Sequence, residues 1–147
     1  MTTRDRLLQA AADEFAAKGY HEATVAEICR RAEANIAAVN YHFGSKEALY
    51  QEAWRQAHQA ADRANPPAGR VPAGAAAKAR LRGRLRALLE RALGDEDMEL
   101  RIMQRELLNP TGLLDQVIHQ TLEPMRLEMA RIVRELLGDL AISRRIG

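Results

Sequence analysis

The segment between Thr24 and Lys46 holds the residue types best suited to binding chemistry. Asn40 carries an amide that can pair with the major-groove edge of adenine, and nearby apolar residues can contact thymine methyl groups: Ile36, Ala37 and Ala38. Lys46 stands at a predicted helix start, where free backbone amides already favour a phosphate. Taken singly, Asn40 and Lys46 are equally compatible with ordinary solvated surface residues. Their role therefore depends on the helices that carry them.

Two helical patterns precede these residues. Apolar residues at helical spacing predict a first helix over about 3–19, and Gly19 is typical of a helix C-terminus. Thr24 followed by Glu27 predicts a capping box at the start of a short second helix over about 24–32. The two patterns predict an N-terminal helical domain.

A third and a fourth helix follow closely. Asn35 is a typical N-cap for a short helix over about 35–44, and Ser45 can cap a longer helix over about 45–63. Two short helices joined by a tight turn form the arrangement in which the second helix enters the major groove of DNA. The pattern therefore predicts a helix-turn-helix held by apolar residues: Leu8, Phe15, Val25, Ile28, Cys29, Val39, Phe43 and Leu49.

Residues 3–50 resemble the N-terminal domain of the TetR family of bacterial regulators, above all in the stretch VNYHFGSKEALY. The resemblance implies a three-helix DNA-binding domain whose third helix contacts bases, and a fourth helix that leads to a ligand-binding domain. It assigns base contacts to Ile36, Ala37, Ala38 and Asn40. It assigns phosphate contacts to Thr24, Tyr41, His42 and Lys46, with Asn35 in the same interface. Tyr41 and His42 have an alternative interpretation as packing residues.

Glu33 departs from the pattern of that family. It occupies the turn between the two short helices, where TetR-like proteins usually have a glycine in a left-handed conformation that is costly for a residue with a Cβ. A carboxylate in this turn would also repel phosphates if it faced them. We therefore expect weaker DNA binding than a glycine would give.

The remainder of the chain is predicted to form a second helical domain. Prolines and glycines in residues 64–74 predict a linker or loop. The expected division is therefore a DNA-binding domain with its connecting helix over 1–63 and an effector-binding and dimerisation domain over 75–147. In the first helix of that domain, a leucine stripe is expected to be core and the flanking arginines solvated, although this basic face could also bind phosphate or a membrane surface. The stripe is Leu81, Leu85, Leu88, Leu89 and Leu93.

Two further helices are predicted after this one. A helix around residues 100–108 ends at Asn109, because the residue before a proline is pushed out of the helical conformation. A long helix over about 113–137 is expected to be kinked by Pro124 and to stop at Gly138.

Residues 105–125 resemble the C-terminal region of one TetR subgroup, the CecR-like (or CerR-like) regulators. This resemblance implies a pocket for a small, mostly apolar effector. Apolar residues at helical spacing also suit a simple core. The candidates for the pocket lining are Tyr50, Trp54, Met103, Leu107, Val117 and Met125.

Composition excludes several classes of protein. Aromatic residues make up only 4% of an otherwise globular composition, which predicts an all-α fold. Cys29 is the only cysteine, so an internal disulfide is excluded. The sequence shows no signal peptide or membrane-spanning run, and a cytoplasmic protein is expected. Without a nucleophile beside a base, a phosphate loop or metal-ligand spacing, we predict no enzyme, no cofactor and no metal.

The resulting hypothesis is a ligand-responsive repressor that binds a palindromic double-stranded operator as a homodimer. Residues 1–63 hold eight basic and nine acidic side chains, so charge alone does not indicate DNA binding. The resemblance also implies two or more dimer-forming helices after Gly138, and the sequence ends before them, which puts the homodimer in doubt. A monomer would engage one half-site only. The alternative is a truncated helical interaction module that pairs with other regulators and binds DNA poorly.

Overall fold

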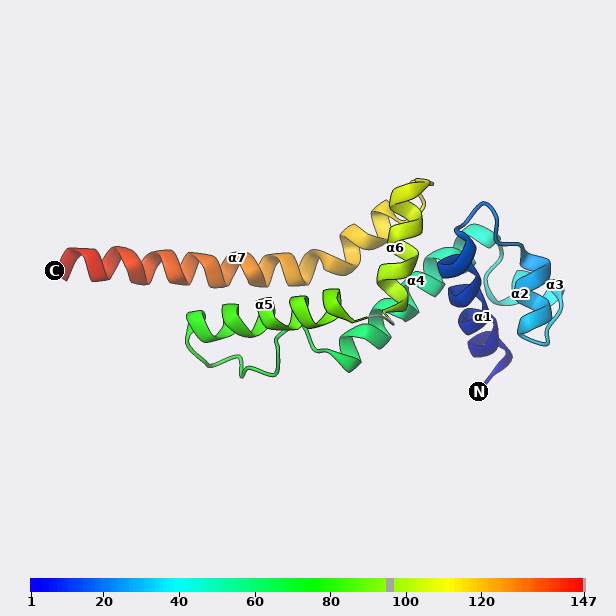
Figure 1. Cartoon of the computed structure of the whole chain (residues 1–147). Helices are drawn as coiled ribbons and strands as arrows, with labels where there is room; N and C mark the ends of the chain where they lie inside the picture. The colour runs from blue at the N-terminus through cyan, green and yellow to red at the C-terminus, as the bar shows by residue number, and fades with distance from the viewer. Residues whose placement is uncertain (95–96, 147) are drawn as a thin grey trace. The chain divides into compact units, whose positions relative to one another are not determined.

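The computed structural model describes residues 1–94 and 97–146, and every regular element within these ranges is a helix. The predicted all-α fold is therefore confirmed. None of the helices in these ranges is long and apolar enough to cross a membrane. In chain order they are α1 (Thr3–Lys18), α2 (Val25–Arg31), α3 (Ile36–His42), α4 (Lys46–Ala64), α5 (Ala77–Leu93), α6 (Met98–Leu108) and α7 (Asp115–Ile146) (Figure 1).

Packing divides the chain into two compact units that do not follow chain order. The first unit contains residues 1–61 and 96–118, and the second contains residues 62–95 and 119–147. The predicted linear division at 64–74 differs from this, because α6 packs against α1 and buries Ile102 completely in the first unit. The linear prediction could not include this contact, since it joins segments far apart in the sequence.

The predicted capping residues occupy the helix starts. The side-chain oxygens of Thr24, Asn35 and Ser45 accept hydrogen bonds from the backbone amide three residues later, at 3.2, 2.9 and 3.1 Å. The predicted capping box at Thr24 is only half formed, because the Glu27 carboxylate binds the Arg30 guanidinium at 2.6 and 3.0 Å instead. The local sequence therefore fixes where α2, α3 and α4 begin.

The core of the first unit confirms the predicted apolar contacts of the helix-turn-helix. Val25 and Phe43 are partly buried against this core, and the other six predicted residues are buried. Each large side chain that is fully buried contributes roughly 1.5–3 kcal/mol, so α3 is held by tertiary packing rather than by its own seven residues. The largest fully buried side chains of this unit include Trp54, Tyr50, Phe15, Leu7, Ile28 and Leu49.

In the second unit, residues 65–74 form a loop that packs on α5. Turn hydrogen bonds run from the Gly69 amide to Pro66 at 2.8 Å and from the Val71 amide to Ala68 at 3.3 Å. The loop meets α5 where both backbones carry glycine. A Cβ at Gly69 would collide with the Gly83 carbonyl, and a Cβ at Gly83 would lie 2.5 Å from a Val71 methyl. The two glycines therefore permit a close approach of backbone to backbone.

The leucine stripe of α5 is not core, contrary to the prediction. Leu81 is half-buried, and the other four leucines are exposed, Leu93 by 81%. The buried residues of α5 are instead the small Ala77, Gly83 and Ala87. The backbone of the preceding loop approaches this face of α5 closely. Small residues allow that approach, whereas leucines would prevent it.

Two of the arginines predicted to be solvated are mostly buried. The side chain of Arg80 is 12% exposed and pairs with Glu128 at 3.4 Å and with Glu135. The side chain of Arg91 is 15% exposed and pairs with Asp62 at 3.4 Å. These pairs lie on the packed side of α5, where a buried cation requires an opposite charge.

Helix α7 is longer than predicted. Pro124 lies inside it, and Gly138 continues it to Ile146 instead of ending it. Gly138 does not adopt the positive φ of a C-terminal cap, in contrast to Gly19 at the end of α1, whose φ is 81°. A glycine in helical conformation costs about 1 kcal/mol relative to alanine, which a long helix tolerates.

Candidate nucleic-acid interface

Helix α3 anchors one face and exposes the other. Val39 is buried at 1% exposure and Ala38 is half-buried against the same core. The opposite face carries four residues of the predicted DNA-binding set, with Ile36 at 55% and Tyr41 at 85% exposure. They are spaced one and four residues apart, as one face of a helix requires: Ile36, Ala37, Asn40 and Tyr41.

Tyr41 and His42 differ in their surroundings. The exposure of Tyr41 contradicts the alternative that it is a packing residue. His42 is half-buried at the end of α3, with its ring centroid 5.0 Å from that of Tyr41 and 6.1 Å from that of Phe43. Tyr41 therefore offers a hydroxyl and a ring face to a ligand, while His42 also supports its neighbours.

Lys46, at the start of α4, is not a freely solvated lysine. Its Nζ atom lies 4.3 Å from the ring centroid of Tyr20, a cation–π contact, and partial burial lowers its pKa. Burial and a hydrogen bond to Glu47 raise the pKa of Tyr20 to about 12, so this ring stays neutral. The contact holds the Lys46 ammonium over the face of the Tyr20 ring.

Thr24 and Asn35 are exposed at the starts of α2 and α3. Their side-chain oxygens already accept the capping hydrogen bonds of these helices. Both residues therefore set the ends of the two short helices, in addition to any contact with a ligand.

The turn between α2 and α3 contains the strained residue expected from the sequence. Glu33 has a φ of 51°. Its amide donates to the Arg30 carbonyl at 3.3 Å, and the Ala34 amide donates to the Cys29 carbonyl at 2.9 Å. This pair of hydrogen bonds is the Schellman motif, in which glycine normally holds the left-handed position. Glu33 occupies that position although its Cβ makes the left-handed conformation unfavourable.

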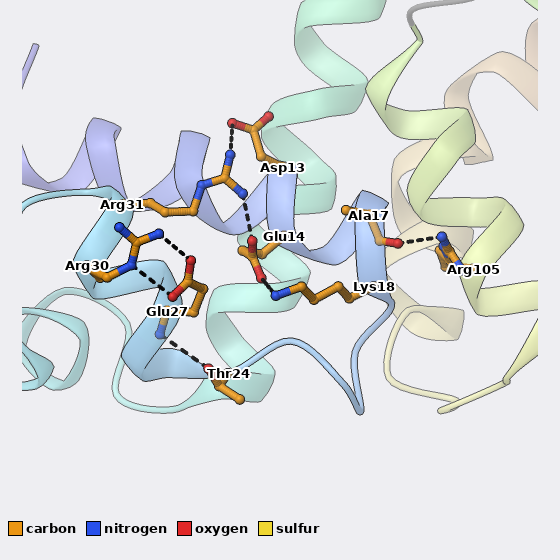
Figure 2. A network of polar contacts seen from close by, with 9 residues as sticks. All are labelled: Asp13, Glu14, Ala17, Lys18, Thr24, Glu27, Arg30, Arg31 and Arg105. Atoms are coloured by element: carbon orange, nitrogen blue, oxygen red, sulfur yellow. Dashed lines mark hydrogen bonds and ion pairs between the residues drawn. The ribbon is translucent and has the colours of Figure 1, made fainter.

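A buried carboxylate joins α1 to α2. Figure 2 shows Glu14 of α1 between Lys18 and Arg31, at 3.0 and 2.6 Å. Burial alone would raise the pKa of Glu14, but these two cations outweigh burial and hold its pKa below the ordinary value. Arg6 adds a second tie, because its Nε donates to the Ala32 carbonyl at 3.0 Å. These contacts fix the helix that supports α3.

Helix α6 is tied to α1 and α4 by the side chains of Arg105 and Glu106. Arg105 donates to the Ala16 carbonyl at 3.2 Å. It also donates to the Ala17 carbonyl at the end of α1 (Figure 2). The Tyr50 hydroxyl of α4 donates to the buried Glu106 carboxylate at 2.7 Å. The other oxygen of Glu106 accepts from the amide and hydroxyl of Thr111, both at 2.8 Å.

The charge state of Glu106 follows from these hydrogen bonds. Burial alone would raise its pKa, but the donors from Tyr50, Thr111 and Gly112 outweigh burial and lower it. Burial and the neighbouring carboxylate raise the pKa of Tyr50. An ionised carboxylate therefore joins α4 to the turn between α6 and α7.

Sequence reasoning missed these ties. Glu14 and Lys18 show an i,i+4 pattern that could have been noticed, since opposite charges at this spacing meet on a helix. Nothing local signals the contact of Arg105 with α1 or that of Glu106 with Tyr50, which span 56 residues or more.

The residues suggested for an effector pocket divide between the two units. Tyr50, Trp54 and Val117 are buried in the core of the first unit, and Met103 packs against it. Leu107 is 75% exposed on α6. Met125 belongs to the second unit, where it lines a groove of about 780 Å³ between α5 and α7. The effector pocket as a whole stays a prediction.

No metal centre is indicated in the part of the chain that the structure covers. Within residues 1–94 and 97–146, no group of three or more His, Cys, Asp or Glu side chains could hold a metal ion. Cys29 is buried, and burial raises the pKa of its thiol.

Two regions of the chain match models of known protein families. A model of bacterial regulatory proteins of the tetR family matches residues 7–53, and a model of the C-terminal domain of the HTH-type transcriptional dual regulator CecR matches residues 77–146. The chain belongs to the TetR family. Its C-terminal region is CecR-like, as the resemblance of residues 105–125 implied.

Individual relatives agree with this assignment. The HTH-type transcriptional dual regulator CecR of Shigella flexneri is 30% identical over 149 residues, which cover 92% of this chain and 65% of CecR. The uncharacterized HTH-type transcriptional regulator YdgC of Bacillus subtilis is 44% identical over 50 residues, or 34% of this chain and 26% of YdgC. This TetR-family chain therefore spans less than two thirds of the length of either relative. Both relatives are named as regulators rather than enzymes, in agreement with the prediction.

Solved structures share the fold. A TetR-like transcriptional regulator from Rhodococcus sp. RHA1 has a TM-score of 0.64 and 21% identity, with 90% of this chain and 70% of that chain covered. A second regulator structure from Rhodococcus sp. RHA1 has a TM-score of 0.55 and 26% identity, with coverage of 84% and 62%. They support the arrangement of a helix-turn-helix domain followed by a helical region.

Proposed function

We propose that this TetR-family chain is a transcriptional regulator that binds double-stranded DNA through the exposed face of α3. The observation that carries the proposal is the anchoring of α3 by Val39 with Ile36, Asn40 and Tyr41 turned to solvent. A helix of this kind fits the major groove, where Asn40 can pair with an adenine edge and Ile36 can contact a thymine methyl. DNA binding would place its action in the cytoplasm.

Phosphate contacts complete the proposed interface. Thr24, Asn35 and Lys46 lie at the starts of α2, α3 and α4, and backbone amides at helix N-termini favour anions. Tyr41 and His42 would add contacts from the end of α3. Because the cations of α1 and α2 are largely engaged with acidic side chains, we expect modest non-specific affinity.

Selection from a random double-stranded DNA pool, followed by titration across a salt series, tests this interface. Asn40→Ala should relax the preference at one base position by about 1–3 kcal/mol. Lys46→Ala should weaken binding to all sequences and flatten the salt slope by about one. Gln59→Ala and Lys78→Ala are matched controls, because both residues are exposed outside the helix-turn-helix. Retention of full specificity by Asn40→Ala and of the salt slope by Lys46→Ala would refute the proposed contacts.

We further propose that the regulator is a homodimeric repressor released from a palindromic operator by a small-molecule effector. The CecR-like C-terminal region and the groove between α5 and α7 support an effector site. Addition of an effector should lower operator affinity through a coupling of about 1–3 kcal/mol. Light scattering during size-exclusion chromatography tests the dimer, and selection of a non-palindromic half-site would contradict it.

A second candidate function is an interaction module that pairs with other regulators. The exposed leucines of α5 favour it, because Leu85, Leu89 and Leu93 form an exposed apolar edge in the second unit. Leu85→Ser combined with Leu89→Ser should abolish association while leaving the helical content unchanged. Association that survives both substitutions would exclude this edge as the pairing surface.

A further inference from the structure

The groove between α5 and α7 has the size and lining of a small-molecule site. Its volume of about 780 Å³ lies within the roughly 300–1,000 Å³ that ligand sites occupy. Apolar side chains from both helices line it, including Leu88, Met125, Met129 and Val133. Methionine adapts its shape to varied apolar ligands, so these residues suit a flexible or aromatic body.

Arginines stand along the edges of this groove, and they are not equivalent. Arg91 pairs with Asp62 at 3.4 Å, and Arg126 pairs with Glu123 at 2.5 and 2.8 Å. Arg84 and Arg134 also line the groove, and within residues 1–94 and 97–146 neither has a hydrogen-bond or ion-pair partner. Two of the four cations are therefore uncommitted.

The two uncommitted arginines lie at the same end of the groove. Arg80 pairs with Glu135, so the N-terminal half of α5 lies beside the C-terminal half of α7 (Figure 1). Arg84 follows Arg80 by one helical turn, and Arg134 precedes Glu135 by one residue. Two guanidinium groups facing one apolar groove repel each other and match an anion that bridges them.

We propose that this groove binds an amphipathic organic anion, with its acidic group between Arg84 and Arg134 and its apolar body on Leu88, Met125 and Met129. The proposal rests on the proposed effector response and names the chemical class of the effector. From Arg84 to Arg91 the helix rises about 10 Å, which accommodates a medium-length alkyl chain or two fused rings. A carboxylate or sulfonate forms ion pairs with both guanidinium groups there, whereas a neutral alcohol can only accept weaker hydrogen bonds from them.

Direct binding of known probes to the full chain tests the site without DNA. The fluorescent sulfonate 1-anilinonaphthalene-8-sulfonate is titrated first, and decanoate and decanol then compete for its site. We expect one sulfonate bound per chain, displaced by decanoate at least about tenfold more effectively than by decanol, since the alcohol lacks the charge. Equal displacement by the two competitors would overturn the proposal.

Substitutions locate the anion. Arg84→Gln and Arg134→Gln should each weaken decanoate binding about tenfold or more, the loss expected for a charge-assisted contact. Arg82→Gln on α5 and Arg131→Gln on α7 are matched controls, because both residues are exposed and outside the groove. Circular dichroism confirms that each variant is folded. Equal effects of the groove variants and the control variants on decanoate binding would overturn the assignment. Light scattering that shows a dimer, together with no decanoate binding that depends on Arg84 and Arg134, would mean that a second copy covers the groove and would also overturn it.

A final measurement separates this site from the proposed DNA function. Operator retention is measured with and without decanoate for the unsubstituted chain and for Arg134→Gln. Loss of retention that requires Arg134 supports the anion as effector. Decanoate binding without any change in retention refutes its effector role. Absence of operator retention without decanoate refutes the DNA function alone.

Discussion

Replacement of Glu33 by glycine should stabilise the first unit. Glu33 holds the left-handed position of the Schellman motif at the end of α2, with a φ of 51°. Its side chain is exposed and makes no contact that a glycine would lose within the described part of the chain. The substitution therefore removes strain without removing packing.

The magnitude follows from two opposing effects. A residue with a Cβ pays about 1–2 kcal/mol in the left-handed region. Glycine pays about 0.5–1 kcal/mol more backbone entropy on folding. The midpoints of these two ranges give a net gain in the free energy of unfolding of about 0.75 kcal/mol, which raises the melting temperature by about 2–3 °C in a chain of this size.

Tryptophan fluorescence during urea unfolding measures this gain in the correct unit. Trp54 is the only tryptophan, and it is fully buried in the core of the first unit. Its signal therefore reports the unfolding of the helix-turn-helix and not of α5. Glu33→Ala is the matched control, because it removes the charge and keeps the Cβ.

The control separates strain from charge. If strain dominates, Glu33→Gly is more stable than both the unsubstituted chain and Glu33→Ala, and Glu33→Asn lies between them, since asparagine tolerates the left-handed region. Equal midpoints for Glu33→Gly and Glu33→Ala would refute the strain argument. A rise in DNA affinity common to both variants would instead reveal repulsion of phosphates by the carboxylate.

Three further outcomes are expected. Gly83→Ala should destabilise the second unit by about 1–3 kcal/mol in thermal circular dichroism, because its Cβ would lie 2.5 Å from a Val71 methyl. Gly138→Ala should stabilise α7 by about 0.5–1 kcal/mol, because a Cβ at Gly138 would have no atom within 4 Å. If both substitutions changed the stability in the same direction, the close approach at Gly83 would be contradicted. Glu106→Gln should lower the free energy of unfolding of the first unit, measured by Trp54 fluorescence, by about 1–3 kcal/mol. Because the folded pKa of Glu106 lies below the ordinary value of 4.5, its contribution is complete above pH 4.5 and is lost as pH falls through the folded pKa. The acid sensitivity of the variant should therefore be weaker, and an unchanged pH profile would contradict this role.

The sequence by itself determined the helix-turn-helix. Thr24, Asn35 and Ser45 cap helices that begin where predicted, because a cap is an interaction between a side chain and an amide three residues away. The strained position of Glu33 was equally predictable, since turn geometry is local. The exposed face of α3 carries Ile36 and Asn40, which the family resemblance had assigned to DNA, opposite the buried Val39.

Two predictions from local sequence patterns were wrong: the core face of α5 and the end of α7. A leucine stripe has the periodicity of a core face, but the packed face carries Ala77, Gly83 and Ala87, because the loop backbone approaches too closely for larger side chains. Gly138 resembles a stop, but a glycine ends a helix only when the chain adopts a left-handed turn there, and α7 continues.

Only the tertiary structure decided which distant segments share a core. It assigned α6 to the N-terminal helices through Ile102 and Arg105, joined Tyr50 to Glu106, and left Arg84 and Arg134 together without acidic partners among the described residues. Such contacts depend on the packing of whole helices, whose free energy sums burial over segments dozens of residues apart. Helix starts and turns depend on neighbours within one turn, and this difference in range separates what the sequence determined from what the fold decided.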